Sequence, residues 1–98
     1  MALYLIEHTH KPEICPTQNP EIVRQLRAHV SPENAEGMGV TILGDWVSEP
    51  EHTVVFIVES DKEENVTRFA GPFQQMGQTQ IRPGLTCEDT ARACLGEV

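Results

Sequence analysis

Basic side chains are scarce in this sequence. Seven Lys and Arg stand against fifteen Asp and Glu, which gives a formal net charge of −8 at pH 7. Binding to a nucleic-acid backbone depends on clustered cations that release counterions from the phosphates, and here the seven basic residues are scattered along the chain. We therefore expect no nucleic-acid partner, and an anionic membrane surface is disfavoured for the same reason.

Long apolar runs are also missing. No stretch approaches the roughly 20 apolar residues that span a bilayer. The N-terminal segment MALYLIEH has no basic part, and its apolar run stops at Glu7, so we expect no secretion signal. The three cysteines are an odd number that cannot all pair within one chain, which favours a reducing compartment and a cytoplasmic location.

Sequence motifs for catalysis are absent as well. No serine has a His and Asp context that indicates a triad, and Gly37-Met38-Gly39 precedes an expected strand, whereas a phosphate-binding loop precedes a helix. The catalytic residues, if the chain has any, are therefore unknown from its motifs.

The sequence that remains is typical of one globular domain spanning residues 1–98. Hydrophobic residues make up 39% and charged residues 22%, and a chain of 98 residues has room for one core. Alternating and β-branched patterns predict strands over residues 2–10, 40–47, 52–59 and 79–85. Gly44 lies inside the second strand and predicts a β-bulge there, and the short connection between residues 47 and 52 predicts a hairpin.

Capping patterns place the helices between these strands. Asn19-Pro20 and Ser31-Pro32 each predict a helix start with proline in its first turn. Ser60 with Glu63 matches a capping box that opens another helix, and Pro72 is expected to kink or end it. Thr86 is the expected cap of a final short helix over residues 87–95.

The resulting order is βαββαβ, which predicts an α+β fold of the ferredoxin-like kind. Right-handed crossovers put both helices on one face of a four-stranded antiparallel sheet. The other face is then left bare with large apolar side chains, so we expect a homodimer that covers it.

Three segments carry a family resemblance. Gly39–Trp46 (GVTILGDW), Phe56–Asp61 (FIVESD) and Ile81–Leu85 (IRPGL) resemble the short dimeric α/β-barrel proteins of unknown function. Those proteins are similar in fold to antibiotic-biosynthesis monooxygenases, muconolactone isomerases and chlorite-dismutase-like domains. The resemblance covers roughly residues 39 to 86 and the first strand. It implies two sheets packed face to face in a dimeric barrel, with any pocket between sheet and helices. No catalytic residue can be assigned from this resemblance, because no catalytic motif is matched.

The sharpest local signal lies at the end of the first strand. His8 and His10 project from the same strand face with Cα atoms about 6.7 Å apart, a spacing that suits two imidazoles on one ion. The thiol of Cys15 follows five residues later, and imidazole with thiolate is a donor set for zinc, copper or nickel. Further ligands would come from Glu13, His52 or Cys87.

Other interpretations of these residues stay open. The two histidines also fit as polar residues at a strand end, and Cys15 as a small loop residue or a reactive thiol. The prediction from this segment is a small protein that binds a transition metal or a small ligand through residues 8–15.

The competing interpretation is a cofactor-independent enzyme of the monooxygenase or isomerase kind. Its pocket would be lined by Tyr4, Trp46, Phe56 and Phe69, with Glu7 or Glu59 as general base if buried. Aromatic residues at strand and helix spacings also pack in cores, and a non-catalytic interaction module is a third interpretation.

Overall fold

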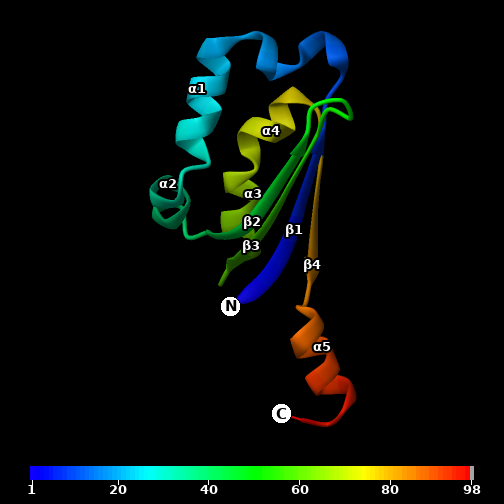
Figure 1. The fold of residues 1–98 in the computed structure, drawn as a ribbon. Helices are drawn as coiled ribbons and strands as arrows, with labels where there is room; N and C mark the ends of the chain where they lie inside the picture. The colour runs from blue at the N-terminus through cyan, green and yellow to red at the C-terminus, as the bar shows by residue number, and fades with distance from the viewer. Residues whose placement is uncertain (98) are drawn as a thin grey trace.

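The four predicted strands form one antiparallel sheet in the order β2-β3-β1-β4 (Figure 1). The computed structural model describes residues 1–97. Its strands are β1 (Ala2–Thr9), β2 (Thr41–Ser48), β3 (Thr53–Ser60) and β4 (Gln78–Gly84). The predicted ferredoxin-like α+β arrangement is confirmed. β4 lies at an edge of the sheet, the position where a proline such as Pro83 is tolerated in a strand.

The helices lie where the capping residues predicted them. They are α1 (Pro20–His29), α2 (Pro32–Gly37), α3 (Glu63–Phe69), α4 (Gly71–Met76) and α5 (Cys87–Cys94). Asn19 Oδ1 accepts a hydrogen bond from the Glu21 backbone N–H at 3.0 Å, and Thr86 Oγ1 accepts one from the Asp89 N–H at 3.0 Å. These side chains satisfy amide groups that the first helical turn leaves without partners. No helix within residues 1–97 is long and apolar enough to cross a membrane.

One predicted cap is wrong. Ser60 does not form a capping box with Glu63: its hydroxyl donates to the Gly39 carbonyl oxygen at 2.7 Å, and its oxygen accepts from Asn65 Nδ2 at 3.3 Å. The hydroxyl oxygen also accepts from the Lys62 backbone N–H at 3.3 Å, and α3 begins after Lys62 without a side-chain cap. A buried tertiary hydrogen bond has replaced the local one. The predicted break at Pro72 is confirmed, because α3 ends at Phe69 and α4 starts at Gly71.

The core fills the space between the sheet and helices α1 to α4, which lie on the same side of it in Figure 1. Ile6, Val58, Val66 and Phe69 are fully buried at its centre. The predicted bulge in β2 is confirmed by a shift in the β2–β3 register between Ile42 and Gly44.

The opposite sheet face carries no helix. Leu5 pairs with Ile57 across β1 and β3, and Trp46 pairs with Val55 across β2 and β3, so these side chains share that face. Ile57 is 42% exposed and Trp46 50% exposed. We call this the uncovered sheet face, and its apolar residues are Leu3, Leu5, Trp46, Val55 and Ile57.

Candidate metal centre and adjoining pocket

His8 in β1 and His10 just after it lie at the end of the sheet where the chain leaves it for the loop before α1. His8 is buried and 1% exposed, whereas His10 is partly buried. The His10 backbone N–H donates to the His52 carbonyl oxygen at 3.1 Å. The end of β1 is therefore fastened to the turn of the β2–β3 hairpin.

That turn puts a third imidazole beside the other two. The His52 backbone N–H donates to the Glu49 carbonyl oxygen at 3.1 Å, and His52 itself has a φ of 50°, in the left-handed region. This conformation is unfavourable for a residue with a side chain, although His adopts it more readily than most. As a result, the His52 ring lies edge-on to the His10 ring with centroids 5.3 Å apart.

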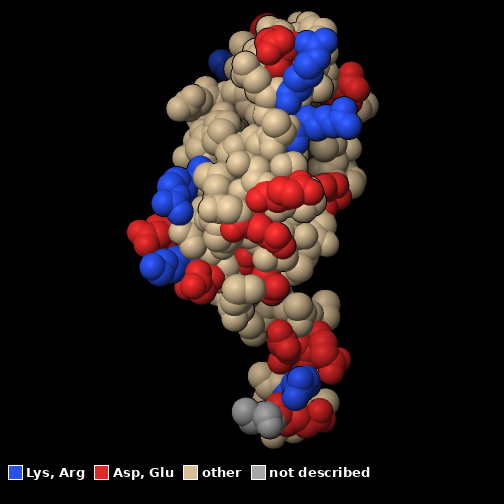
Figure 2. Space-filling view, turned by 90° about the vertical axis from the view of Figure 1, so that its left-hand side faces the viewer, with Lys and Arg blue, Asp and Glu red and all other residues tan. Residues whose placement is uncertain are grey.

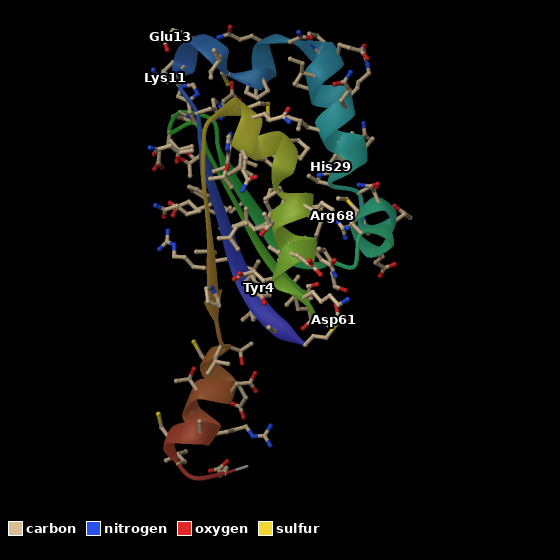
Figure 3. The ribbon with its side chains drawn as sticks, turned by 180° about the vertical axis from the view of Figure 1, so that it is seen from behind. Tyr4, Lys11, Glu13, His29, Asp61 and Arg68 are labelled. Atoms are coloured by element: carbon tan, nitrogen blue, oxygen red, sulfur yellow. The ribbon has the colours of Figure 1, made fainter. Side chains whose placement is uncertain are left out.

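Cys15 arrives from the loop after β1, which is built of two short 3-10 turns, Pro12–Ile14 and Pro16–Gln18. Its backbone N–H donates to the Pro12 carbonyl oxygen at 3.3 Å, which turns the chain back toward the sheet. The Cys15 side chain is buried, and its Sγ lies 3.0 Å from the Thr17 hydroxyl. Glu13 lies at the outer tip of this loop (Figure 3).

The three side chains bring their donor atoms together. One ring nitrogen each of His10 and His52 and the Sγ of Cys15 all lie within 4.8 Å of one another. His10 Nε2 and His52 Nδ1 are buried and have no hydrogen-bond partner within residues 1–97. Buried polar atoms are nearly always paired, so two unpaired nitrogens beside a thiol need an explanation.

A metal ion supplies one. Donors around tetrahedral zinc, bonded at about 2.0–2.3 Å, lie roughly 3.5 Å apart, so small side-chain rotations bring this set to bonding distance. Imidazole nitrogen and thiolate sulfur are also the ligand types that zinc, copper and nickel accept. The residues therefore fit a three-ligand transition-metal centre. We name the set of His10, Cys15 and His52 the His–Cys–His cluster.

Burial and charge proximity favour the neutral forms of His8 and His10, and neutral imidazole is the form that binds metal. Burial first and the neighbouring His10 second lower the pKa of His8 to about 4, against the opposing effect of a hydrogen bond to the Gln78 backbone. The pKa of His10 is also lowered, mainly by burial and then by the proximity of His52.

Behind the cluster runs a short chain of hydrogen bonds. His10 Nδ1 lies 3.2 Å from His8 Nε2, and His8 Nδ1 lies 3.2 Å from the hydroxyl of Thr79 on β4. When His10 Nε2 binds an ion, its proton must be on Nδ1, which then donates to His8 Nε2. His8 in turn carries its proton on Nδ1 and donates to Thr79. The buried His8 would thereby fix the tautomer of His10 if His10 holds an ion, as carboxylates or carbonyls do at other metal sites.

Gly77, between α4 and β4, holds the end of β1 in place by close approach. A Cβ at this position would lie 2.4 Å from the Thr9 carbonyl oxygen and 3.0 Å from the His10 Cα. Only a residue without a side chain lets the two backbones meet here. The position of His10 therefore depends on this glycine.

A pocket of about 410 Å³ adjoins the cluster. It lies between α1, α4 and the helix-covered side of the sheet, and its walls are almost wholly apolar. His8, His10 and Arg27 are among the lining residues, but the surface that they present to the pocket is apolar. The lining residues are His8, His10, Pro16, Thr17, Val23, Leu26, Arg27, Val30, Val47, Val54, Phe56, Phe73 and Met76.

The predicted site residues are distributed between these two features. The structure brings His10 and Cys15 together and adds His52, while His8 stands behind His10 with both nitrogens engaged. Cys87 lies on α5, at the other end of the molecule (Figure 1). The sequence signal for His52 was its position in the turn of the predicted hairpin. The antiparallel β1–β3 register brings this turn beside the end of β1.

The predicted aromatic pocket is only partly assembled. Phe56 lines the observed pocket, whereas Tyr4 and Phe69 belong to the core and Trp46 lies on the uncovered sheet face. Glu59 is on that face too, and Glu7 pairs there with Arg82. No carboxylate lines the pocket among residues 1–97.

Comparisons with known proteins agree with the fold. A family model described as "Domain of unknown function (DUF3303)" matches residues 2–97. A solved structure described as "Crystal structure of antibiotic biosynthesis monooxygenase" superposes with a TM-score of 0.56 at 16% sequence identity, covering 88% of this chain and 98% of the other. No curated protein matches the chain. At 16% identity this likeness shows a shared fold, not a shared activity.

Proposed function

The chain belongs to the DUF3303 family, whose description names no activity, and from the geometry of its site we propose that it binds a transition metal. His10, Cys15 and His52 are the ligands, and zinc, copper or nickel is the ion. The observation that carries this proposal is the pair of buried, unpartnered nitrogens, His10 Nε2 and His52 Nδ1, facing a buried thiol.

Three protein ligands leave a tetrahedral ion with one free position. Sites of this type bind water or a substrate there, and the bound metal supplies Lewis-acid chemistry. His10 contributes to the cluster and also lines the pocket of about 410 Å³. A small ligand in the pocket is therefore placed next to the proposed metal, which unites the two functions expected from the end of β1.

The proposal is tested by metal titration of the untagged protein. Purified chain is stripped with a chelator and titrated with Zn²⁺, Cu²⁺ or Ni²⁺ against a competing indicator, with elemental analysis of the recovered complex. We expect one ion per chain. Absence of bindable metal overturns the proposal.

Matched variants separate the cluster from chance binding. His52→Asn removes the imidazole but keeps a residue that accepts the left-handed backbone, and Cys15→Ser removes the thiolate. We expect each to weaken binding at least about a hundredfold, because loss of a supporting residue alone costs 10- to 100-fold. Cys94→Ser, at an exposed thiol on α5, serves as the control and leaves the affinity unchanged.

The second candidate function is cofactor-independent chemistry on a small apolar substrate. The pocket favours it, since its volume lies within the range of small-molecule sites and its walls are apolar. Its acid–base group would be His10, because both nitrogens of His8 are engaged and carboxylates are not among the lining residues. Binding of an apolar fluorescent probe that is unchanged by chelator and by Cys15→Ser would support this candidate over the metal-dependent one.

We propose that the working form is a homodimer in the cytoplasm. The uncovered sheet face offers Trp46 and Ile57 to a second copy, and apolar surface of this kind associates in water. A reducing compartment keeps the thiol ligand available. Sedimentation analysis of wild type and Ile57→Asp tests the dimer, and a monomeric wild type would contradict it.

A further inference from the structure

The C-terminal helix α5 (Cys87–Cys94) stands apart from the rest of the chain. It continues from the end of β4 and extends beyond the sheet, away from helices α1 to α4 (Figure 1). Every residue of α5 is exposed, and the flanking Leu85 and Leu95 are 66% and 71% exposed. An isolated helix of eight residues is marginal in water, so α5 needs a packing partner.

One face of α5 is built to pack. At 100° per residue, Cys87, Ala91, Cys94 and the C-cap Leu95 fall on one apolar stripe, whereas the small Ala93 lies off it. Asp89 and Arg92 lie away from the stripe and Glu88 lies at its edge, and Figure 2 shows charged side chains on this lower end of the molecule. The helix is therefore amphipathic, but its apolar stripe packs against no other part of the described chain.

The exposed area of the whole chain indicates how large the missing contact is. The accessible surface is 6586 Å², whereas a monomer of 10.9 kDa is expected to expose about 5600 Å². The radius of gyration is 14.8 Å, against about 12.6 Å for a compact domain of this length. The excess of about 1000 Å² compares with the ~800 Å² that each partner buries in a standard protein interface.

We propose that α5 is an arm exchanged between two copies of this chain, in which the apolar stripe of each α5 packs on the partner. The inference rests on the proposed homodimer and adds a second contact to it. A second copy of this chain is the favoured occupant, because the same chain also exposes the uncovered sheet face and one twofold pairing would cover both surfaces. A two-residue link, Leu85 and Thr86, joins the arm to β4 of that sheet.

Two variants of the full chain test the arm. Leu95→Asp places a charge in the stripe, and Ala93→Asp places the same charge on a part of the helix turned away from it. By sedimentation equilibrium, we expect Leu95→Asp to raise the dimer dissociation constant at least about tenfold, because a charge replaces the apolar contact that Leu95 would make with the partner. Ala93→Asp should change it less than about twofold.

A second measurement asks where α5 docks. Amide hydrogen exchange of residues 87–94 is followed in the wild type above and below the dimer dissociation constant. An exchanged arm loses its protection on dilution, and this result together with the variant pattern supports the proposal. Protection that does not depend on concentration, or a Leu95→Asp dimer as tight as wild type, overturns the arm while leaving the dimer intact. A chain that is monomeric throughout overturns both, and leaves the metal proposal untouched.

Discussion

His8 Nε2 and His10 Nδ1 lie 3.2 Å apart, so a fully buried imidazole is in hydrogen-bond contact with a proposed metal ligand. This pair links the covered side of the sheet, where His8 sits, to the His–Cys–His cluster at its end. Because neither ring nitrogen of His8 is left free, its role in the account is to orient His10.

The first prediction concerns His8. His8→Leu removes the acceptor for the His10 Nδ1 proton and should weaken metal binding about 10- to 100-fold without changing the stoichiometry. His8→Gln keeps a side-chain oxygen and should lose less. Competition titration with an indicator gives both affinities. Loss of stoichiometric binding in His8→Gln would mean that His8 is itself a ligand.

The pKa shifts make a prediction about stability without metal. The pKa of His8 is about 4 in the fold and near 6.5 when unfolded, so the unfolded chain binds more protons between these values. The free energy of unfolding should therefore fall as pH drops from about 6.5 to about 4, by on the order of 1–3 kcal/mol. The lowered pKa of His10 acts in the same direction.

Urea unfolding of the chelator-treated protein between pH 4 and 8 measures this dependence. Above pH 7 the two histidines should contribute no slope. His8→Gln should flatten the curve below pH 6.5, and an unchanged slope in this variant would show that the protons are taken up elsewhere.

Gly77 provides a prediction on geometry. Gly77→Ala puts a Cβ against the Thr9 carbonyl and His10, so we expect a destabilisation above about 1 kcal/mol and weaker metal binding. Gly71→Ala is the matched control, because a Cβ there meets nothing within 4 Å and alanine is the better helix former. Thermal unfolding and titration compare the two. Equal stability and equal metal affinity of the two variants would contradict a role of this close approach in positioning His10.

The thiols should differ in reactivity. Cys87 and Cys94 are exposed in the single chain and Cys15 is buried, so below the dimer dissociation constant an alkylating reagent should modify the first two quickly and Cys15 slowly. Zinc should slow the modification of Cys15 further and leave the others unchanged, as peptide mass spectrometry would show. Fast labelling of Cys15 in the presence of zinc would contradict its role as a ligand.

Local patterns were enough to predict the elements and their order. Asn19, Ser31 and Thr86 cap the helices as expected, because capping depends only on neighbours within one turn. Ser60 failed as a cap because its hydroxyl is held by the distant Gly39 carbonyl and its oxygen accepts from Lys62 and Asn65 and not from the Glu63 N–H. Tertiary context decided the outcome there.

The site was partly predictable for the same reason. His10 and Cys15 are close in sequence, whereas the contribution of His52 depends on the strand register and on one left-handed residue in the hairpin turn. Trp46 was expected in the pocket, but the shift at Gly44 and the pairing with Val55 place it on the uncovered face. The projection of α5 away from the domain could not be predicted from the sequence, because no local pattern tells whether a helix finds a packing surface in its own chain.

X-ray absorption at the metal edge of the zinc-loaded, untagged protein tests the central claim most directly. We expect one sulfur ligand at about 2.3 Å and nitrogen ligands at about 2.0–2.1 Å, with the sulfur lost in Cys15→Ser and one nitrogen lost in His52→Asn. A spectrum with no sulfur, or one that both variants leave unchanged, would contradict a metal centre built from His10, Cys15 and His52.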